Sequence, residues 1–132
     1  MSAYNEMMRS YAPAVIEASQ GKLDFLKMNL QAYTELPVEN HNHLRIAFFK
    51  IRIKMIIFEK MIFSNLDREA KFYADMYSKC LEICGELVEL GENYVSSGLT
   101  GEQAYLDICS FTKENVDDFK LILTNLQECA SK

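Results

Sequence analysis

The sequence contains little that would turn a chain sharply. Its 132 residues include only 5 Gly, 2 Pro and no Trp. Seven glycines and prolines are too few to connect the many short strands of a sandwich or barrel. A hydrophobic content of 49% against 25% charged residues also excludes a disordered chain. We therefore expect a compact helical protein that is long enough to bury a core.

Segments that would direct the chain to a membrane are lacking as well. The N-terminal residues show no charged stretch followed by an apolar one, as a secretory signal would. The most apolar stretch, residues 46–63, still contains five charged side chains. Because each charge costs about 2.5–3.5 kcal/mol at the centre of a bilayer, this stretch would not span a membrane. We expect a cytoplasmic protein without membrane contact.

Motifs of enzymes and cofactor sites are missing too. The sequence contains no nucleophile elbow, no P-loop and no dinucleotide-binding fingerprint. Its four cysteines form no Cys-x-x-Cys pair, and the Glu-x-x-His motif of di-iron bundles does not occur. We therefore expect a non-enzymatic protein with no catalytic residue, no metal and no cofactor.

Charge is distributed unevenly along the chain. Residues 1–63 carry 8 basic and 6 acidic side chains, whereas residues 64–132 carry 6 basic and 13 acidic ones, which gives a net charge of −5. An acidic protein repels phosphate backbones, so this balance disfavours nucleic acid as a partner. We expect the partner to be another protein or a second copy of this chain.

The N-terminal third predicts two short helices. Apolar residues recur at helical spacing over residues 2–19 and again over residues 22–35. Pro13 would interrupt the first of these segments, unless Ser10 caps a new helix that has Pro13 in its first turn. Gly21 would end the segment in a left-handed conformation. Together the two segments would supply a broken member of a bundle.

Three long helices are predicted for the rest of the chain. They cover residues 38–63, residues 66–97, and a final segment that begins at a capping box formed by Thr100 and Gln103. Elements of matching length joined by short turns pack as antiparallel neighbours. The sequence thus predicts an all-α protein, an antiparallel bundle of four to five helices in which residues 1–132 form a single domain.

The helix over residues 38–63 is apolar on two faces. One face is a continuous seam with 4-3-4-3-4 spacing, and the other lies about a third of a turn away. Both must be covered, either within the bundle or by a second chain. The seam consists of Leu44, Phe48, Ile51, Met55, Phe58 and Ile62, and the second face of Phe49, Ile53, Ile56 and Phe63.

A charged row runs between these two faces at seven-residue intervals. It consists of Arg45, Arg52 and Glu59. A buried arginine without a carboxylate is strongly unfavourable, so an acidic side chain should lie near unless the row faces solvent. The acidic residues that could serve are Glu82, Glu86 and Asp107.

Histidine and cysteine side chains suggest structural roles. His41 and His43 stand at a polar helix start, where capping is a more ordinary role than weak metal binding by His43 with Glu39. Cys80 and Cys84 lie on an apolar helix face and should pack as small hydrophobic residues in reduced form. Among the four thiols, which also include Cys109, Cys129 lies in the last turn of a helix that should fray, and we expect it to be the most accessible.

The doubly apolar helix is the most informative feature for function. We expect an interaction module, an adaptor, chaperone or regulator, that binds a partner or dimerises through this helix. An alternative is a bundle that binds a small apolar ligand or cofactor among Phe48, Phe49, Tyr73, Tyr77 and Phe119. The residues expected to bind the partner are Leu44, Arg45, Phe48, Ile51, Arg52, Met55, Phe58, Glu59 and Ile62.

Overall fold

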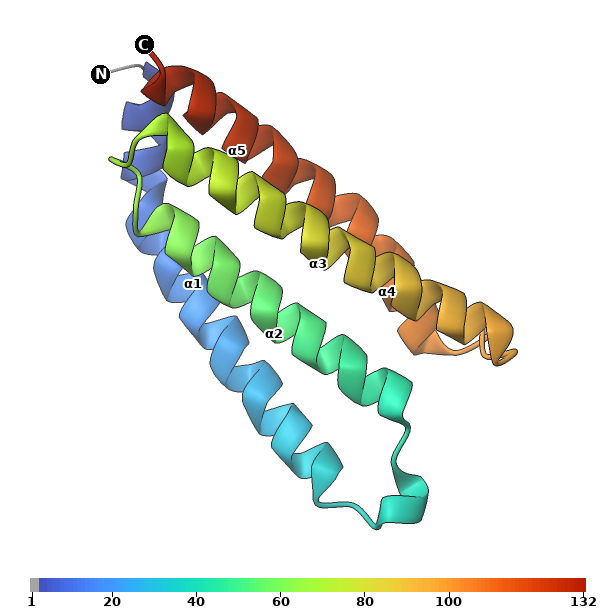
Figure 1. Ribbon diagram of the computed structural model, residues 1–132. Helices are drawn as coiled ribbons and strands as arrows, with labels where there is room; N and C mark the ends of the chain where they lie inside the picture. The colour runs from blue at the N-terminus through green and yellow to red at the C-terminus, as the bar shows by residue number, and fades with distance from the viewer. Residues whose placement is uncertain (1–2) are drawn as a thin grey trace.

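The computed structural model describes residues 3–132, which form an elongated bundle of antiparallel helical rods (Figure 1). No strand occurs in this part of the chain, and the predicted all-α class is confirmed. None of its helices combines the length and the apolar character that a membrane span requires. The elements are α1 (Ala3–Thr34), a 3-10 turn (Val38–Asn40), α2 (His43–Phe63), α3 (Ala70–Ser96), α4 (Gln103–Phe111), a π-helical turn (Thr112–Val116) and α5 (Asp117–Ala130).

Helix α1 is continuous, so the prediction of two short N-terminal helices is wrong. Pro13 lies inside α1, and Gly21 keeps an ordinary helical conformation there. An internal proline costs about 3 kcal/mol. Burying one large apolar side chain gains about 1.5–3 kcal/mol, and α1 buries Met8, Leu23 and Leu26 along its length. Packing against the bundle therefore outweighs the local break signals.

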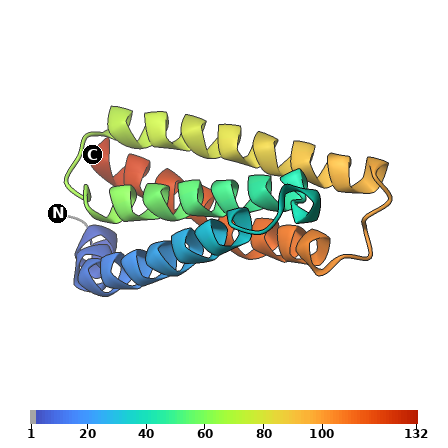
Figure 2. The same ribbon diagram turned by 90° about the horizontal axis from the view of Figure 1, so that it is seen from below.

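The four rods follow one another around the bundle in chain order. Helix α1 packs along α2, α2 along α3, and α3 along the rod formed by α4, the π-helical turn and α5. Both ends of the described chain lie at the same end of the bundle, where α1 also meets α5 (Figure 2). Toward its other end α1 diverges from α4, and α2 lies between them.

Both apolar faces of α2 are covered within the chain. All six residues of the seam are buried in the main core against α3 and the α4–α5 rod. On the second face Ile56 packs with Leu23 and Leu26 of α1, and Phe49 and Ile53 complete this smaller cluster. The bundle therefore needs no second chain to cover α2.

The rod that ends the chain begins later than predicted and is interrupted. Gly98, at φ 70°, ends α3 in the left-handed conformation, so the predicted break is confirmed. The predicted capping box is wrong, because Glu102 is the N-cap of α4 and makes no side-chain cap bond. At Thr112–Val116 the helix widens into a π turn, where Thr112 Oγ1 donates to the carbonyl of Ile108 at 2.8 Å.

The α2–α3 turn depends on a buried tyrosine. The hydroxyl of Tyr73 donates to the carbonyl of Asn65 at 2.8 Å and accepts from the backbone N–H of Arg68 at 3.2 Å. An ion pair between Arg9 and Asp67 ties the same turn to α1. The hydroxyl therefore holds two backbone groups that would otherwise lack a partner.

Replacing Tyr73 with Phe should lower the free energy of unfolding by about 1–3 kcal/mol, because backbone groups lose their buried partner. Urea denaturation followed by circular dichroism measures this change. Tyr77→Phe on the same helix is the matched control, since its hydroxyl makes no hydrogen bond within residues 3–132, and it should change stability much less. Equal stability of the wild-type and Tyr73→Phe proteins would contradict this role.

Candidate functional site

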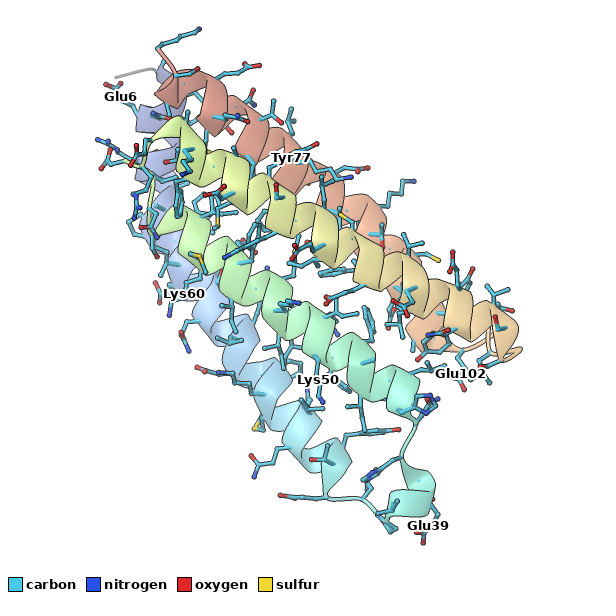
Figure 3. All side chains as sticks on the ribbon, viewed as in Figure 1. Glu6, Glu39, Lys50, Lys60, Tyr77 and Glu102 are labelled. Carbon is cyan, nitrogen blue, oxygen red and sulfur yellow. The ribbon has the colours of Figure 1, made fainter. Side chains whose placement is uncertain are left out.

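A cleft opens where α4 begins and faces the first turns of α2. Its volume is about 490 Å³. Figure 3 shows Glu102 at this end of the bundle, across from the start of α2. The cleft is lined by Tyr33 of α1, by Asn42, Arg45, Phe48, Phe49 and Arg52 at and within α2, and by Glu102, Gln103, Ala104 and Asp107 at and within α4.

Arg45 and Arg52 lie on the floor of the cleft, two helical turns apart. The guanidinium of Arg45 lies 5.1 Å from the ring centroid of Tyr33, and that of Arg52 lies 5.5 Å from the ring centroid of Phe48. Stacking on an aromatic face holds a guanidinium in place and leaves its N–H groups free. Neither arginine forms an ion pair within residues 3–132. Both are therefore available to an incoming anion.

The acidic residues expected near the row take three different positions. Asp107 lines the cleft together with both arginines, but its Oδ1 accepts a hydrogen bond from Gln103 at 2.9 Å and it pairs with neither of them. The prediction is wrong for Glu86, which binds the ammonium of Lys54 at 2.9 and 3.2 Å. Glu82 lines a separate hollow on the other side of α2, which Lys54 also lines.

The cleft continues as a groove along α2. A hollow of about 320 Å³ shares Arg52 and Asp107 with the cleft and extends to Glu114 and Asn115. A further hollow of about 190 Å³ shares Glu114 and Asn115 and reaches Glu59. Because a helix rises 1.5 Å per residue, this groove follows about 21 Å of α2. The row of Arg45, Arg52 and Glu59 therefore forms the floor of one groove.

The π-helical turn forms part of the opposite wall of the groove. Glu114 and Asn115 belong to it and line the hollows next to Arg52 and Glu59. The amide of Asn115 donates to the carbonyl of Phe111 at 3.1 Å, so one freed backbone acceptor is satisfied inside the turn. Single π turns inside helices occur frequently at functional sites. The sequence predicted an uninterrupted helix here and gave no signal for this turn.

Glu59 and Tyr94 are the titratable groups most affected by this environment. Burial raises the pKa of Glu59 above its ordinary value of 4.5, and Lys22, which lines the same hollow, lowers it only in part. Burial likewise raises the pKa of Tyr94, helped by the charge of Glu102 and opposed by that of Arg45. The Tyr94 hydroxyl is buried without a hydrogen-bond partner in residues 3–132.

The histidine segment shapes the end of the cleft. The hydroxyl of Tyr33 accepts from the backbone N–H of Asn42 at 2.8 Å, and Asn42 caps α2 by accepting from the N–H of Leu44 at 2.9 Å. His41 stacks on Tyr33, and its Nε2 lies 2.6 Å from the carbonyl of Leu36. His43 is exposed, and no three His, Cys, Asp or Glu side chains within residues 3–132 are placed to hold a metal.

The residues expected to bind a partner do not share one surface. Six of the nine, the residues of the α2 seam, are buried in the core, and of these only Phe48 also lines the cleft. The other three, Arg45, Arg52 and Glu59, remain in the groove. Of the aromatic set expected around a ligand, only Phe48 and Phe49 line the cleft. Tyr73 and Phe119 are buried in the core, against which the half-buried Tyr77 packs, and Phe119 also lines the hollow near Glu59.

Comparison with known proteins identifies no relative. No family model matches the chain, and neither the curated proteins nor the solved structures give a significant match. The proposal below therefore depends on the groove itself.

Replacing Glu59 with Gln should raise the free energy of unfolding at pH 7. Because burial raises the folded-state pKa of Glu59, its contribution to stability is complete below pH 4.5 and is lost as the pH rises through the raised pKa. The difference in free energy of unfolding between Glu59→Gln and wild type should therefore disappear toward pH 4. Urea unfolding at several pH values tests this, with Glu128→Gln, an exposed carboxylate on α5, as the control. A variant less stable than wild type at pH 7 would contradict it.

The four thiols should react with iodoacetamide in a fixed order. Cys109 is exposed and Cys129 is half-buried, so the prediction that Cys129 is the more accessible is wrong. Burial, with a further contribution from Cys84, raises the pKa of Cys80 to about 11, which leaves about one thousandth of it as thiolate at pH 8. Mass spectrometry should find Cys109 alkylated first and Cys80 only after unfolding. Early alkylation of Cys80 would show that the core is open.

Proposed function

We propose that the protein is a non-enzymatic interaction module that binds a segment of a partner protein in the groove along α2. The observation that carries this proposal is the pair of unpaired guanidinium groups of Arg45 and Arg52, stacked on aromatic rings in an open cleft. Two arginines held in this way, two turns apart on α2, favour carboxylates as ligands. Each guanidinium can bind one carboxylate through two parallel hydrogen bonds.

Charge along the groove suggests the polarity of the bound segment. The end at Arg45 and Arg52 offers guanidinium donors beside the carboxylates of Glu102 and Asp107, whereas the other end combines Glu59, Glu114 and Asp118 with a single lysine, Lys22. A matching segment carries acidic side chains at one end and a basic side chain at the other. Electrostatic complementarity of this kind fixes the direction in which a segment binds.

The shape of the groove favours a polypeptide over a compact small molecule. The cleft alone has a volume typical of small-molecule sites, about 300–1,000 Å³. However, its lining combines two arginines with two carboxylates, which does not suit an apolar ligand, and it continues into two further hollows. Native mass spectrometry of freshly purified protein distinguishes the two cases, since a stoichiometric bound molecule would favour the ligand alternative.

Peptide selection tests the proposal without knowledge of the partner. A displayed library of random peptides should yield binders enriched in Asp or Glu. Binding to the Arg45→Gln/Arg52→Gln variant should be at least about tenfold weaker, because each charge-assisted hydrogen bond contributes about 1.5–3 kcal/mol. Fluorescence polarisation of the selected peptides measures this loss.

The matched control removes the same charge from the surface outside the groove. Lys50 and Lys71 are exposed and line none of the three hollows of the groove, and Figure 3 shows Lys50 on α2. The Lys50→Gln/Lys71→Gln variant should bind the peptides as wild type does. Failure to select any peptide, or equal binding by the arginine variant, would contradict the proposal.

A further inference from the structure

The outward face of α1 carries an apolar stripe that residues 3–132 leave exposed. Its members recur at alternating intervals of four and three residues and lie within an arc of about 100° on a helix of 3.6 residues per turn. The large members are Met7, Tyr11, Phe25 and Met28, and the small ones between and beyond them are Ala14, Ala18, Gly21 and Ala32. Leu36 continues the stripe just past the end of α1.

The exposed area of this stripe is close to the minimum that a specific interface requires. Met7, Tyr11, Phe25, Met28 and Leu36 are 46, 60, 60, 62 and 45% exposed. With about 150–200 Å² for a large side chain, two copies together present roughly 1,000 Å². That is close to the lower limit of about 1,000–1,200 Å² for a specific protein interface. Exposed contiguous apolar surface of this kind marks interaction sites.

We propose that this stripe is the contact surface of an antiparallel homodimer, in which α1 of one copy packs against α1 of a second copy around a two-fold axis at Gly21. No residue of the stripe lines the three hollows of the groove along α2, although a hollow beside the stripe shares Arg45 and Arg52 with the cleft. Substitutions confined to α1 therefore test this proposal separately from the groove.

The order of large and small residues selects the antiparallel arrangement. With the axis between Gly21 and Lys22, Tyr11 faces Ala32 of the second copy and Phe25 faces Ala18. Met28 lies opposite Ala14 with an offset of one residue from this register. Three of the five large side chains, Tyr11, Phe25 and Met28, then meet a small one, which allows the two faces to interdigitate around the axis, while Met7 faces Leu36 at either end. A parallel pair in register would instead place Phe25 against Phe25 and Ala18 against Ala18, which leaves clashes beside gaps.

Gly21 is compatible with a close approach of two helices at the axis. A Cβ atom added to Gly21 would meet nothing within 4 Å, and the residue has no left-handed conformation. Glycine weakens a helix relative to alanine, and no contact in the described chain requires it at this position. At a crossing point of two helices, however, the missing side chain lets the backbones approach closely.

A hollow beside the stripe can receive the tyrosine of the second copy. Ala32, which would face Tyr11, lines a hollow of about 520 Å³ together with Phe25 and Leu36. Arg45 and Arg52 also line it. A phenol ring that enters here meets guanidinium groups, which favour aromatic faces.

Charges next to the axis predict the effect of salt. Lys22 of each copy lies at the margin of the stripe next to the axis, and it also lines the hollow of Glu59 in its own copy. Glu17 and Asp24 follow the opposite margin. Salt screens repulsion between like exposed charges, so added sodium chloride should tighten the dimer instead of weakening it.

Sedimentation velocity over a range of concentrations tests the proposal. The wild-type chain of 15.2 kDa should form a dimer with a dissociation constant of about 1–100 µM, as suits a small interface. In the Ala18→Phe variant, the new phenylalanine of each copy faces Phe25 of the other copy. These two clashes should raise the dissociation constant at least about tenfold. Because Ala18 is exposed, circular dichroism and the urea midpoint should stay as in wild type.

A swapped double variant then tests the register. Ala18→Phe combined with Phe25→Ala restores a large residue opposite a small one in the antiparallel pair, so it should dimerise within about threefold of wild type. Gln127→Phe, which adds a phenylalanine on the exposed surface of α5, is the control and should leave the dissociation constant of the dimer unchanged.

Three results would overturn the proposal. They are a wild-type chain that stays monomeric up to about 200 µM, a dimer that Ala18→Phe does not weaken, and a swapped variant that stays as weak as the single one. The first result would indicate that the stripe serves another protein or a lipid surface.

Discussion

The structure depends on the need to cover two apolar faces of α2 while the charges between them stay in contact with water. Leaving a large apolar side chain exposed forfeits about 1.5–3 kcal/mol, and α2 carries such side chains on both faces. Helix α1 covers one face, and α3 with the α4–α5 rod covers the other. Because Arg45, Arg52 and Glu59 lie between these faces, α1 and the rod diverge on either side of them. The groove is the consequence of this arrangement.

The same constraint explains why the groove is polar while the bundle around it is apolar. Its floor is the charged row of α2, and its walls come from α1 and the α4–α5 rod, whose inward-facing apolar side chains are already buried in the core. The arginines stack on aromatic rings instead of pairing with carboxylates, which leaves their N–H groups accessible. A groove with a fixed order of charges distinguishes between bound segments by their charge pattern more than by their size.

Sequence periodicity predicted the helical class, the seam of α2 and the charged row, because all three repeat over several turns within one helix. It failed where contacts between helices decide the outcome. The local signals of Pro13 and Gly21 predicted a break, but packing against α2 keeps α1 continuous. The π turn at Thr112–Val116 and the position of Asp107 beside the arginines depend on how α4 packs, and no local pattern records them. The sequence also could not tell whether the seam of α2 is covered by helices of the same chain or by a second chain, because that depends on how the other helices are arranged.

The most direct test of the account follows the arginine side chains themselves. In a titration of ¹⁵N-labelled protein with a short peptide rich in Asp and Phe, the Nε–Hε resonances of Arg45 and Arg52 report whether their guanidinium groups bind carboxylates. Arg9, which is paired with Asp67, serves as the internal reference. The account predicts saturable shifts for Arg45 and Arg52 and an unchanged signal for Arg9. If all three arginines shift alike, or if Arg45 and Arg52 do not respond, the groove is not a site for acidic segments.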